Sequence, residues 1–136
     1  MRYLFIFLWL FQLSLNSFAQ KVKEEEIFTA VEKQAEFPGG MGAFGRYLQR
    51  SKALSSLVKE YCNRGIPFSV RIECVIDKSG DVSNIKFVKS AGFEDAEKIF
   101  IAEFGKELTE KWIPASNKNI PVRSKFTIPI HTSCSE

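Results

Sequence analysis

The chain holds a single histidine, His131, so any reaction that needs an imidazole as general base has one candidate. A triad of nucleophile, histidine and acid would have to use this residue. His131 follows directly on a stretch that alternates as a strand does, and a lone histidine at a strand end is usually a surface residue. We find no catalytic constellation around it and therefore expect that the protein is not an enzyme.

Other residue types that often carry chemistry have simpler explanations here. Glu24, Glu25 and Glu26 form a charged run, which is typical of a solvated segment. Asp77 and Asp81 flank a turn, where aspartate is favoured without any cation. Gly39 and Gly40 do not follow a strand, so they are not a phosphate-binding loop. We expect no cofactor, no metal site and, at a net charge of only +3 without a dense basic block, no nucleic-acid partner.

The elements that position these residues are organised around the stretch 67–90. Apolar residues occupy every second position from Phe68 to Ile76, as on a strand with one buried and one solvent-exposed face. The segment 77–81 forms a turn in which Gly80 can take a positive φ. A second strand follows from Val82 to Lys89, so the stretch predicts a β-hairpin.

Helices flank this hairpin on both sides. After the break at 36–40, Phe44, Tyr47 and Leu48 have helical spacing, and a second short helix is predicted from Ser55 to Asn63. A third helix is predicted to begin at the acidic residues 94–95 and to run through Leu108 and Trp112 until Pro114 ends it. The segment from Ile120 to Ile130 alternates again and predicts a third strand.

These elements predict an α+β fold. A strand–helix–strand crossover makes strands 2 and 3 parallel, and with strand 1 between them all neighbouring strands are antiparallel. The predicted sheet has three strands in the order 2-1-3, with the helices packed on one face. Strand 3 is then an edge, which suits Pro121 and Pro129.

The same order bears on the three cysteines. The end of strand 3, near Cys134, would lie close to the start of strand 1, which follows Cys62. One hypothesis is therefore a Cys62–Cys134 disulfide, with Cys74 a free thiol in the core. The alternative is three unpaired thiols that fill space.

The first residues have the features of a targeting segment. Residues 1–19 contain Arg2, then an apolar run, then small residues before Gln20, as in a cleavable signal peptide. The alternative is an uncleaved membrane anchor, for which the apolar run is short. We expect export, with 20–35 a polar, solvated lead-in and 36–132 the folded domain, and without an integral membrane anchor after cleavage.

The feature with functional content is the predicted edge strand. Its unpaired N–H and C=O groups could pair with an extended peptide, in which case Arg123, Lys125 and Thr127 would contact the flanking side chains. Alternatively, Arg123 and Lys125 are gatekeepers that protect the edge from pairing. A third hypothesis is an assembly module that forms a homodimer through the same edge.

Several motifs in order resemble the TonB C-terminal domain, in the version common in energy transducers of Bacteroidetes-type bacteria. The resemblance extends over roughly Val31 to Ile130, which is most of the chain after the predicted cleavage site. Its most specific motifs are Glu36–Gly40 (EFPGG), Ile76–Gly80 (IDKSG), Lys111–Pro114 (KWIP), Pro121–Val122 (PV) and Thr127–Pro129 (TIP). The resemblance implies a TonB-like fold and a periplasmic domain that binds the TonB box, a short extended peptide of outer-membrane transporters.

In that family the peptide pairs with the last strand. The resemblance therefore implies a peptide-binding edge at Val122, Arg123, Ser124, Lys125, Phe126, Thr127 and Ile128, with the transporter or another periplasmic protein as partner. Family transducers also have an inner-membrane helix that couples to a motor, followed by a long Pro-rich linker. The apolar segment here is predicted to be cleaved and no such linker follows it, so we do not expect this chain to transmit energy by itself.

Overall fold

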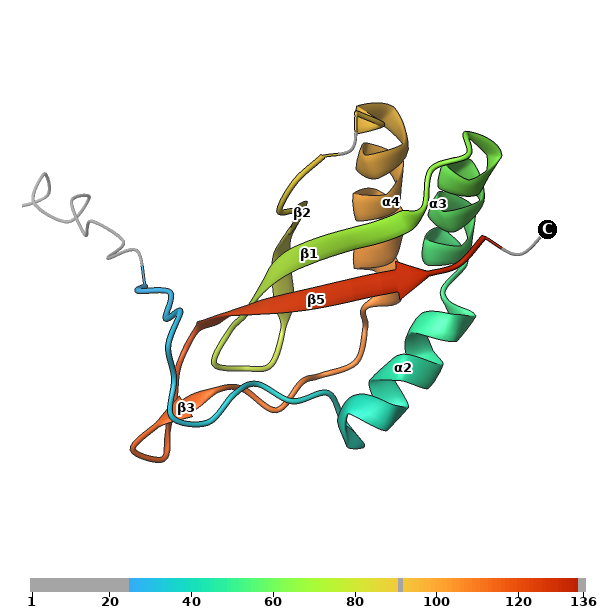
Figure 1. The fold of residues 1–136 in the computed structure, drawn as a ribbon. Helices are drawn as coiled ribbons and strands as arrows, with labels where there is room; N and C mark the ends of the chain where they lie inside the picture. Colours follow the sequence, from blue (N-terminus) through green and yellow to red (C-terminus); the bar gives the residue numbers. More distant parts are fainter. Residues whose placement is uncertain (1–24, 91, 135–136) are drawn as a thin grey trace, which may run out of the picture.

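The computed structural model describes residues 25–90 and 92–134 (Figure 1). The predicted signal peptide and the first part of the lead-in lie outside the described residues. Within these ranges, no helix is long and apolar enough to cross a membrane. The elements are α2 (Gly40–Arg50), α3 (Lys52–Asn63), β1 (Phe68–Ile76), β2 (Val82–Phe87), α4 (Glu94–Glu107), β3 (Ser116–Asn117), β4 (Ile120–Pro121) and β5 (Ser124–Thr132).

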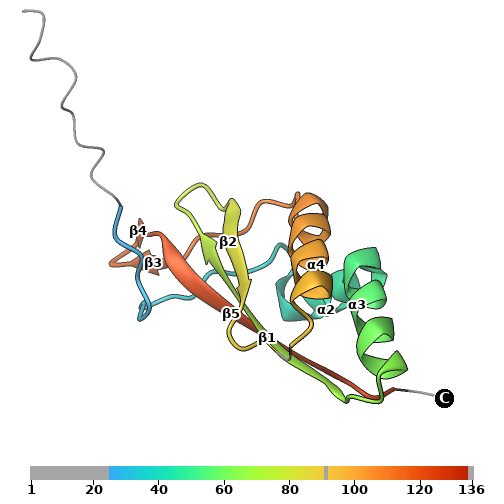
Figure 2. The ribbon, with the colours of Figure 1, turned by 90° about the horizontal axis from the view of Figure 1, so that it is seen from above.

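The main sheet has three antiparallel strands in the order β2-β1-β5, as the sequence predicts. The pairing of β1 with β5 is continuous over nine residues, from Phe68 opposite Thr132 to Ile76 opposite Ser124. Figure 2 shows α2, α3 and α4 on one side of the sheet, with the other side left open. The α+β class and the placement of the helices on one face are therefore confirmed.

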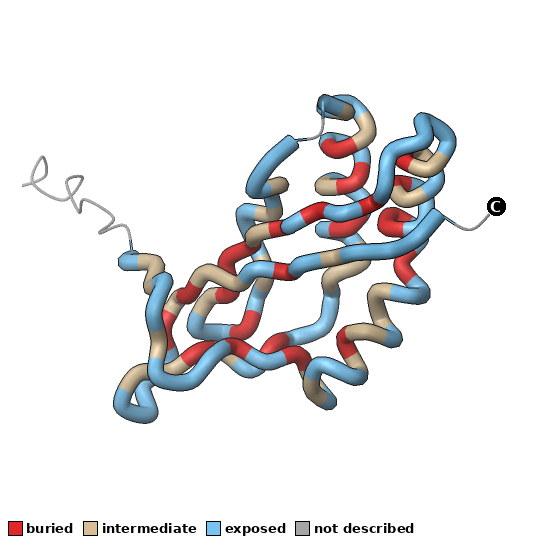
Figure 3. Tube along the Cα trace, viewed as in Figure 1, coloured by how far each residue is buried: buried red, intermediate tan, exposed pale blue. Residues whose placement is uncertain are grey.

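The core lies between the helices and β1, where the alternation of the strand places its apolar side chains. Phe68, Ile72 and Ile76 are at most 1% exposed, and Phe44 of α2 and Phe104 of α4 are buried against the same cluster. Figure 3 shows the buried positions along β1 and on the inner sides of the helices. Burial of this many large side chains anchors the sheet to the helices.

The third helix ends earlier than predicted. α4 stops at Glu107, and Trp112 belongs to an irregular segment in which its backbone N–H donates to the carbonyl of Gly80 at 2.9 Å. Its ring is 3% exposed and packs on Phe37 and Phe44, with ring centroids 5.4 and 5.2 Å away. The prediction of a helix up to Pro114 was wrong because tertiary packing of the indole determines the path of this segment.

The third strand is also shorter at its start than predicted. Ile120 and Pro121 belong to a separate two-stranded hairpin, β3–β4, whose turn residues Lys118 and Asn119 have φ of +50° and +63°. The edge strand β5 begins only at Ser124 and continues to Thr132. Alternation alone could not separate the two strands, because residues 120–130 keep an alternating pattern across the break.

The described part of the lead-in is not simply solvated. Phe28 forms a parallel bridge with Ser124, Lys33 pairs with Ser116, and Glu36 pairs with Ile113. The Phe28 side chain is half-buried and packs against the core. Residues 28–36 therefore belong to the folded unit.

Candidate functional site

The outer edge of β5, on the side away from β1, is the candidate site. At its start the N–H of Lys125 donates to the carbonyl of Phe28 at 3.0 Å, and the N–H of Phe28 donates to the carbonyl of Arg123 at 2.8 Å. In an antiparallel pair, the N–H and C=O of one residue point to the same side, and the side changes at each residue. The backbone groups of Thr127, Pro129 and His131 therefore point outward, like those of Lys125.

This outer edge is open from Thr127 to His131. β5 is the last strand of its sheet, and no backbone group of the described residues pairs with this side beyond Lys125. Pro129 lies at one of the outward positions, where its missing N–H removes no hydrogen bond of the sheet. The edge thus offers N–H donors at Thr127 and His131, and carbonyl acceptors at Thr127, Pro129 and His131.

The predicted edge residues are divided among three environments. Val122, Ser124 and Ile128 are buried, and Phe126 packs on Trp112 with ring centroids 4.9 Å apart. Arg123 and Lys125 carry the backbone contacts to Phe28, and Thr127 is the one residue of the predicted set that is exposed as a whole. The open part of the edge is thus displaced toward the C-terminus relative to the predicted range 122–128.

The two predicted cations of the edge are engaged within the chain. The Arg123 guanidinium donates to the Glu25 carbonyl at 3.4 Å. The Lys125 Nζ lies 3.2 Å from Glu73, which Lys86 also contacts at 3.1 Å. Hydrogen bonds from Lys86 and then Lys125 lower the pKa of the Glu73 carboxyl. Because Lys125 already forms an ion pair with Glu73, this lysine is a poor candidate for direct contact with a partner.

An apolar pocket lies beside the C-terminal half of the open edge. It has a volume of about 480 Å³, and its apolar lining comes from Leu48 of α2, Leu54 and Val58 of α3, and Ile130 of β5. Lys59 is the only lysine or arginine in the lining, which holds no carboxylate. Leu48 and Val58 lie in segments that the sequence predicts to be helical, but only the packing of β5 against these helices places both side chains beside the edge.

A shallower hollow of about 340 Å³ lies on the open face of the sheet. Arg71, Lys89 and Pro129 contribute to its lining, together with the pair formed by Ser69 Oγ and His131 Nδ1, which are 2.8 Å apart. The sequence did not identify Ser69 as a neighbour of His131, although Ser69 lies on the solvent-exposed face of the predicted first strand and His131 directly follows the predicted third strand. No acidic side chain contacts the pair among the described residues.

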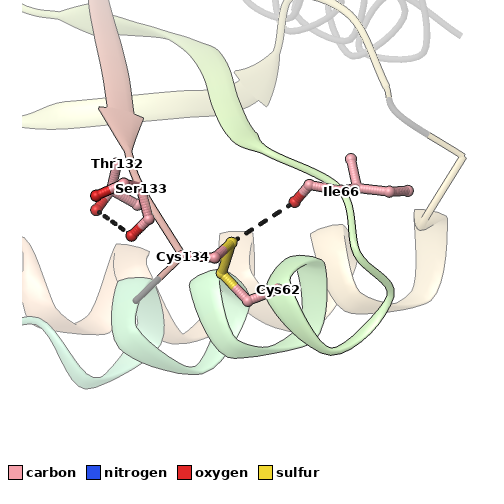
Figure 4. Close-up of a disulfide and its surroundings, with 5 residues drawn as sticks. All are labelled: Cys62, Ile66, Thr132, Ser133 and Cys134. Atoms are coloured by element: carbon pink, nitrogen blue, oxygen red, sulfur yellow. Dashed lines mark hydrogen bonds between the residues drawn. A yellow bond between two sulfur atoms is a disulfide. The ribbon is translucent and has the colours of Figure 1, made fainter. Parts of the chain in front are cut away.

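A disulfide joins Cys62 of α3 to Cys134, just beyond β5, with Cα atoms 5.5 Å apart (Figure 4). This is the pairing that the sheet order suggested. Cys74 is free and buried, and burial raises the pKa of its thiol to about 12. The disulfide fixes the end of the edge strand to the helix that lines the apolar pocket.

The other candidate groups form no further site in the described parts of the chain. No cluster of three or more potential metal ligands occurs there. The Asp77 carboxylate accepts the N–H groups of Ser79 and Asp81 at 2.8 and 2.9 Å, and Asp81 pairs with Lys111. These contacts agree with the interpretation of Asp77 and Asp81 as turn residues.

No family model, curated protein or solved structure matches this chain.

Proposed function

We propose that this protein binds an extended peptide by strand addition along the outer edge of β5. The observation that carries the proposal is the run of outward backbone groups from Thr127 to His131, which has no partner among the described residues. A strand laid beside it can accept from two N–H groups and donate to three carbonyls. Each such hydrogen bond contributes a net stabilisation of about 0.5–1.5 kcal/mol.

Two further features support strand addition at this place. The edge is fixed on its inner side by nine paired residues of β1, so a bound peptide would meet a rigid template. Phe28 already pairs with the start of the same edge, which is the kind of contact that an added strand would continue. The segment around Phe28 also limits the binding site, because it occupies the outward groups of Arg123 and Lys125.

The resemblance of the sequence to the TonB C-terminal domain supports a specific partner. We propose the TonB box of an outer-membrane transporter, or a similar peptide of a periplasmic protein, with the predicted signal peptide directing this chain to the periplasm. The protein would then support transport as a binding module rather than as an enzyme. The predicted edge remains the contact strand, but the bound region is Thr127 to His131.

A proline at Thr127 tests the proposal. The Thr127 N–H points away from β1, so Thr127→Pro removes a donor from the outer edge without removing a hydrogen bond of the sheet. Pro129 already occupies the equivalent outward position two residues later. We expect this variant to lose at least about tenfold in affinity for nine-residue TonB-box peptides in fluorescence anisotropy, as the loss of about 1.4 kcal/mol predicts.

Thr127→Val is the matched control, because it changes the side chain but keeps the N–H. It should bind as the wild type does, and circular dichroism should show both variants folded. Unchanged affinity of a folded Thr127→Pro variant would refute strand addition at this edge. Proline at Lys125 is a less clean test, since its N–H is bonded to Phe28 in the free protein.

The homodimer hypothesis predicts pairing of two copies along the same edge. Arg71 and Lys89 flank the hollow on the open face next to β5, and a two-fold pairing would bring two sets of these cations together. Sizing at several protein concentrations separates the two hypotheses. A monomer at all concentrations favours the peptide partner, and a dimer that Thr127→Pro dissociates favours self-assembly.

A further inference from the structure

The apolar pocket is continuous with the open edge. Ile130 lies between Pro129 and His131, whose backbone groups point outward, and its half-buried side chain lines the pocket on the helix side of the sheet. The other apolar walls come from α2 and α3, and no residue of β1 takes part. The pocket therefore lies on the side of β5 where a strand would be added, not beneath the paired part of the sheet.

An added strand would present its side chains to the two faces in turn. The peptide residue opposite Ile130 points to the same face as Ile130, toward Leu48, Leu54 and Val58. Its two neighbours in the peptide, opposite Pro129 and His131, point to the open face. The same peptide thus meets an apolar pocket with one residue and a polar surface with the residues on either side.

The charge on both faces at this place is positive. Arg71 lies directly across from Pro129 on β1, and Lys89 lines the same hollow. Lys59 lies at the pocket on the helix side. All three are exposed, none forms an ion pair with a described residue, and neither hollow is lined by a carboxylate. Lys86 and Lys125 differ in this respect, because both form an ion pair with Glu73.

We infer that the pocket is a side-chain subsite that selects a peptide in which one aliphatic residue is flanked on both sides by acidic residues. The inference rests on the proposed strand addition and adds its sequence preference. The aliphatic side chain fills the space between α2, α3 and Ile130, while the acidic neighbours point to the open face, which carries Arg71 on β1 and Lys89 beyond it. Pro129 lies between Arg71 and the added strand.

Three labelled nine-residue peptides, equal except at the three central positions, test the inference by anisotropy. The first has Glu-Leu-Glu at its centre, the second Glu-Ser-Glu and the third Gln-Leu-Gln. Loss of the buried leucine should weaken binding about tenfold or more, since its apolar side chain is removed from water in the pocket. Loss of the two acids should weaken it about threefold to tenfold at low salt, and this difference should shrink at 0.5 M salt.

Two pairs of variants assign these preferences to residues. Val58→Glu should remove the preference for leucine over serine, whereas Ser56→Glu, which adds the same carboxylate to the other side of α3, should keep it. Arg71→Gln should reduce the preference for glutamate over glutamine, and Arg46→Gln, an exposed change on α2, should not. Because Arg71 is exposed, Arg71→Gln should not disturb the core, and the test with this variant does not depend on a stability change.

The outcomes separate the inference from the function on which it rests. If all three peptides bind the wild type equally and Thr127→Pro abolishes binding, the subsite is wrong while strand addition stands. If the preferences persist in Val58→Glu and Arg71→Gln, the inference is likewise overturned. If folded Thr127→Pro binds the first peptide as tightly as the wild type, strand addition itself is wrong. The subsite is supported if Val58→Glu loses the preference for leucine and Arg71→Gln the preference for glutamate, while the controls Ser56→Glu and Arg46→Gln keep them.

Discussion

Gly80 joins the turn of the β1–β2 hairpin to the segment after α4, and its replacement should be unusually costly. Its φ is +85°, and its carbonyl accepts the N–H of Trp112 at 2.9 Å. A Cβ built at Gly80 would lie only 2.0 Å from the Trp112 carbonyl oxygen. Gly80→Ala should therefore lower the unfolding free energy in two ways. Alanine is strained in a left-handed backbone conformation, and its Cβ must displace the main chain that places the indole in the core.

The two costs can be separated with a second glycine. A left-handed conformation costs a residue with a Cβ about 1–2 kcal/mol, and overpacking adds about 1–3 kcal/mol. Gly65, after α3, has a φ of +70° but no atom within 4 Å of an added Cβ. Gly65→Ala should therefore lose only the first amount, and Gly80→Ala the sum of about 2–5 kcal/mol.

Urea unfolding measures this difference, followed by the fluorescence of Trp112, the only tryptophan outside residues 1–19. Gly80→Ala should unfold at a clearly lower urea concentration than Gly65→Ala, with a blue-shifted emission partly lost before the main transition. Equal stability of the two variants would refute the close approach of Gly80 to Trp112. The indole segment would then not be held by the hairpin turn.

Three further predictions concern the parts that hold the edge strand. Replacing Cys62 and Cys134 by alanine should lower the unfolding free energy by about 4.4 kcal/mol for a separation of 72 residues; three alkylatable thiols in the unreduced protein would contradict the disulfide. Burial raises the pKa of Cys74 from 9.0 to about 12, so its contribution to stability is complete below pH 9 and is lost as the pH rises toward 12. Cys74→Ala should therefore show a flatter alkaline decline in urea titrations, and an unchanged slope would refute this. Phe28→Ala should cost about 2 kcal/mol, less than a fully buried phenylalanine, and should speed amide exchange at Lys125; unchanged exchange would show that the lead-in does not hold the edge.

Much of the fold follows from local patterns. The alternation from Phe68 to Ile76 predicted β1 with the bounds that the structure has, because one face of the strand is buried against helices along its whole length. The sheet order followed from crossover rules and was confirmed. The end of α4 was not predictable from propensity, since the path of Trp112 depends on Gly80, about thirty residues earlier in the chain.

The candidate site was less accessible to sequence analysis. Alternation identified the edge strand but could not show that Phe28, nearly a hundred residues earlier, occupies its first outward groups. It also could not show that Lys125 forms an ion pair with Glu73, because that contact depends on the register between β1 and β5. The first fact moves the open edge to Thr127–His131, the second removes Lys125 as a contact residue, and both arise from long-range pairing.

The most direct measurement is amide hydrogen exchange, residue by residue, with and without a saturating Glu-Leu-Glu peptide. We expect the outward amides of Thr127 and His131 to exchange rapidly in the free protein and to become protected on binding. The amides of Ile128 and Ile130, which face β1, should be protected in both states. Protection that is unchanged at Thr127 and His131 while the peptide is bound would contradict strand addition at this edge.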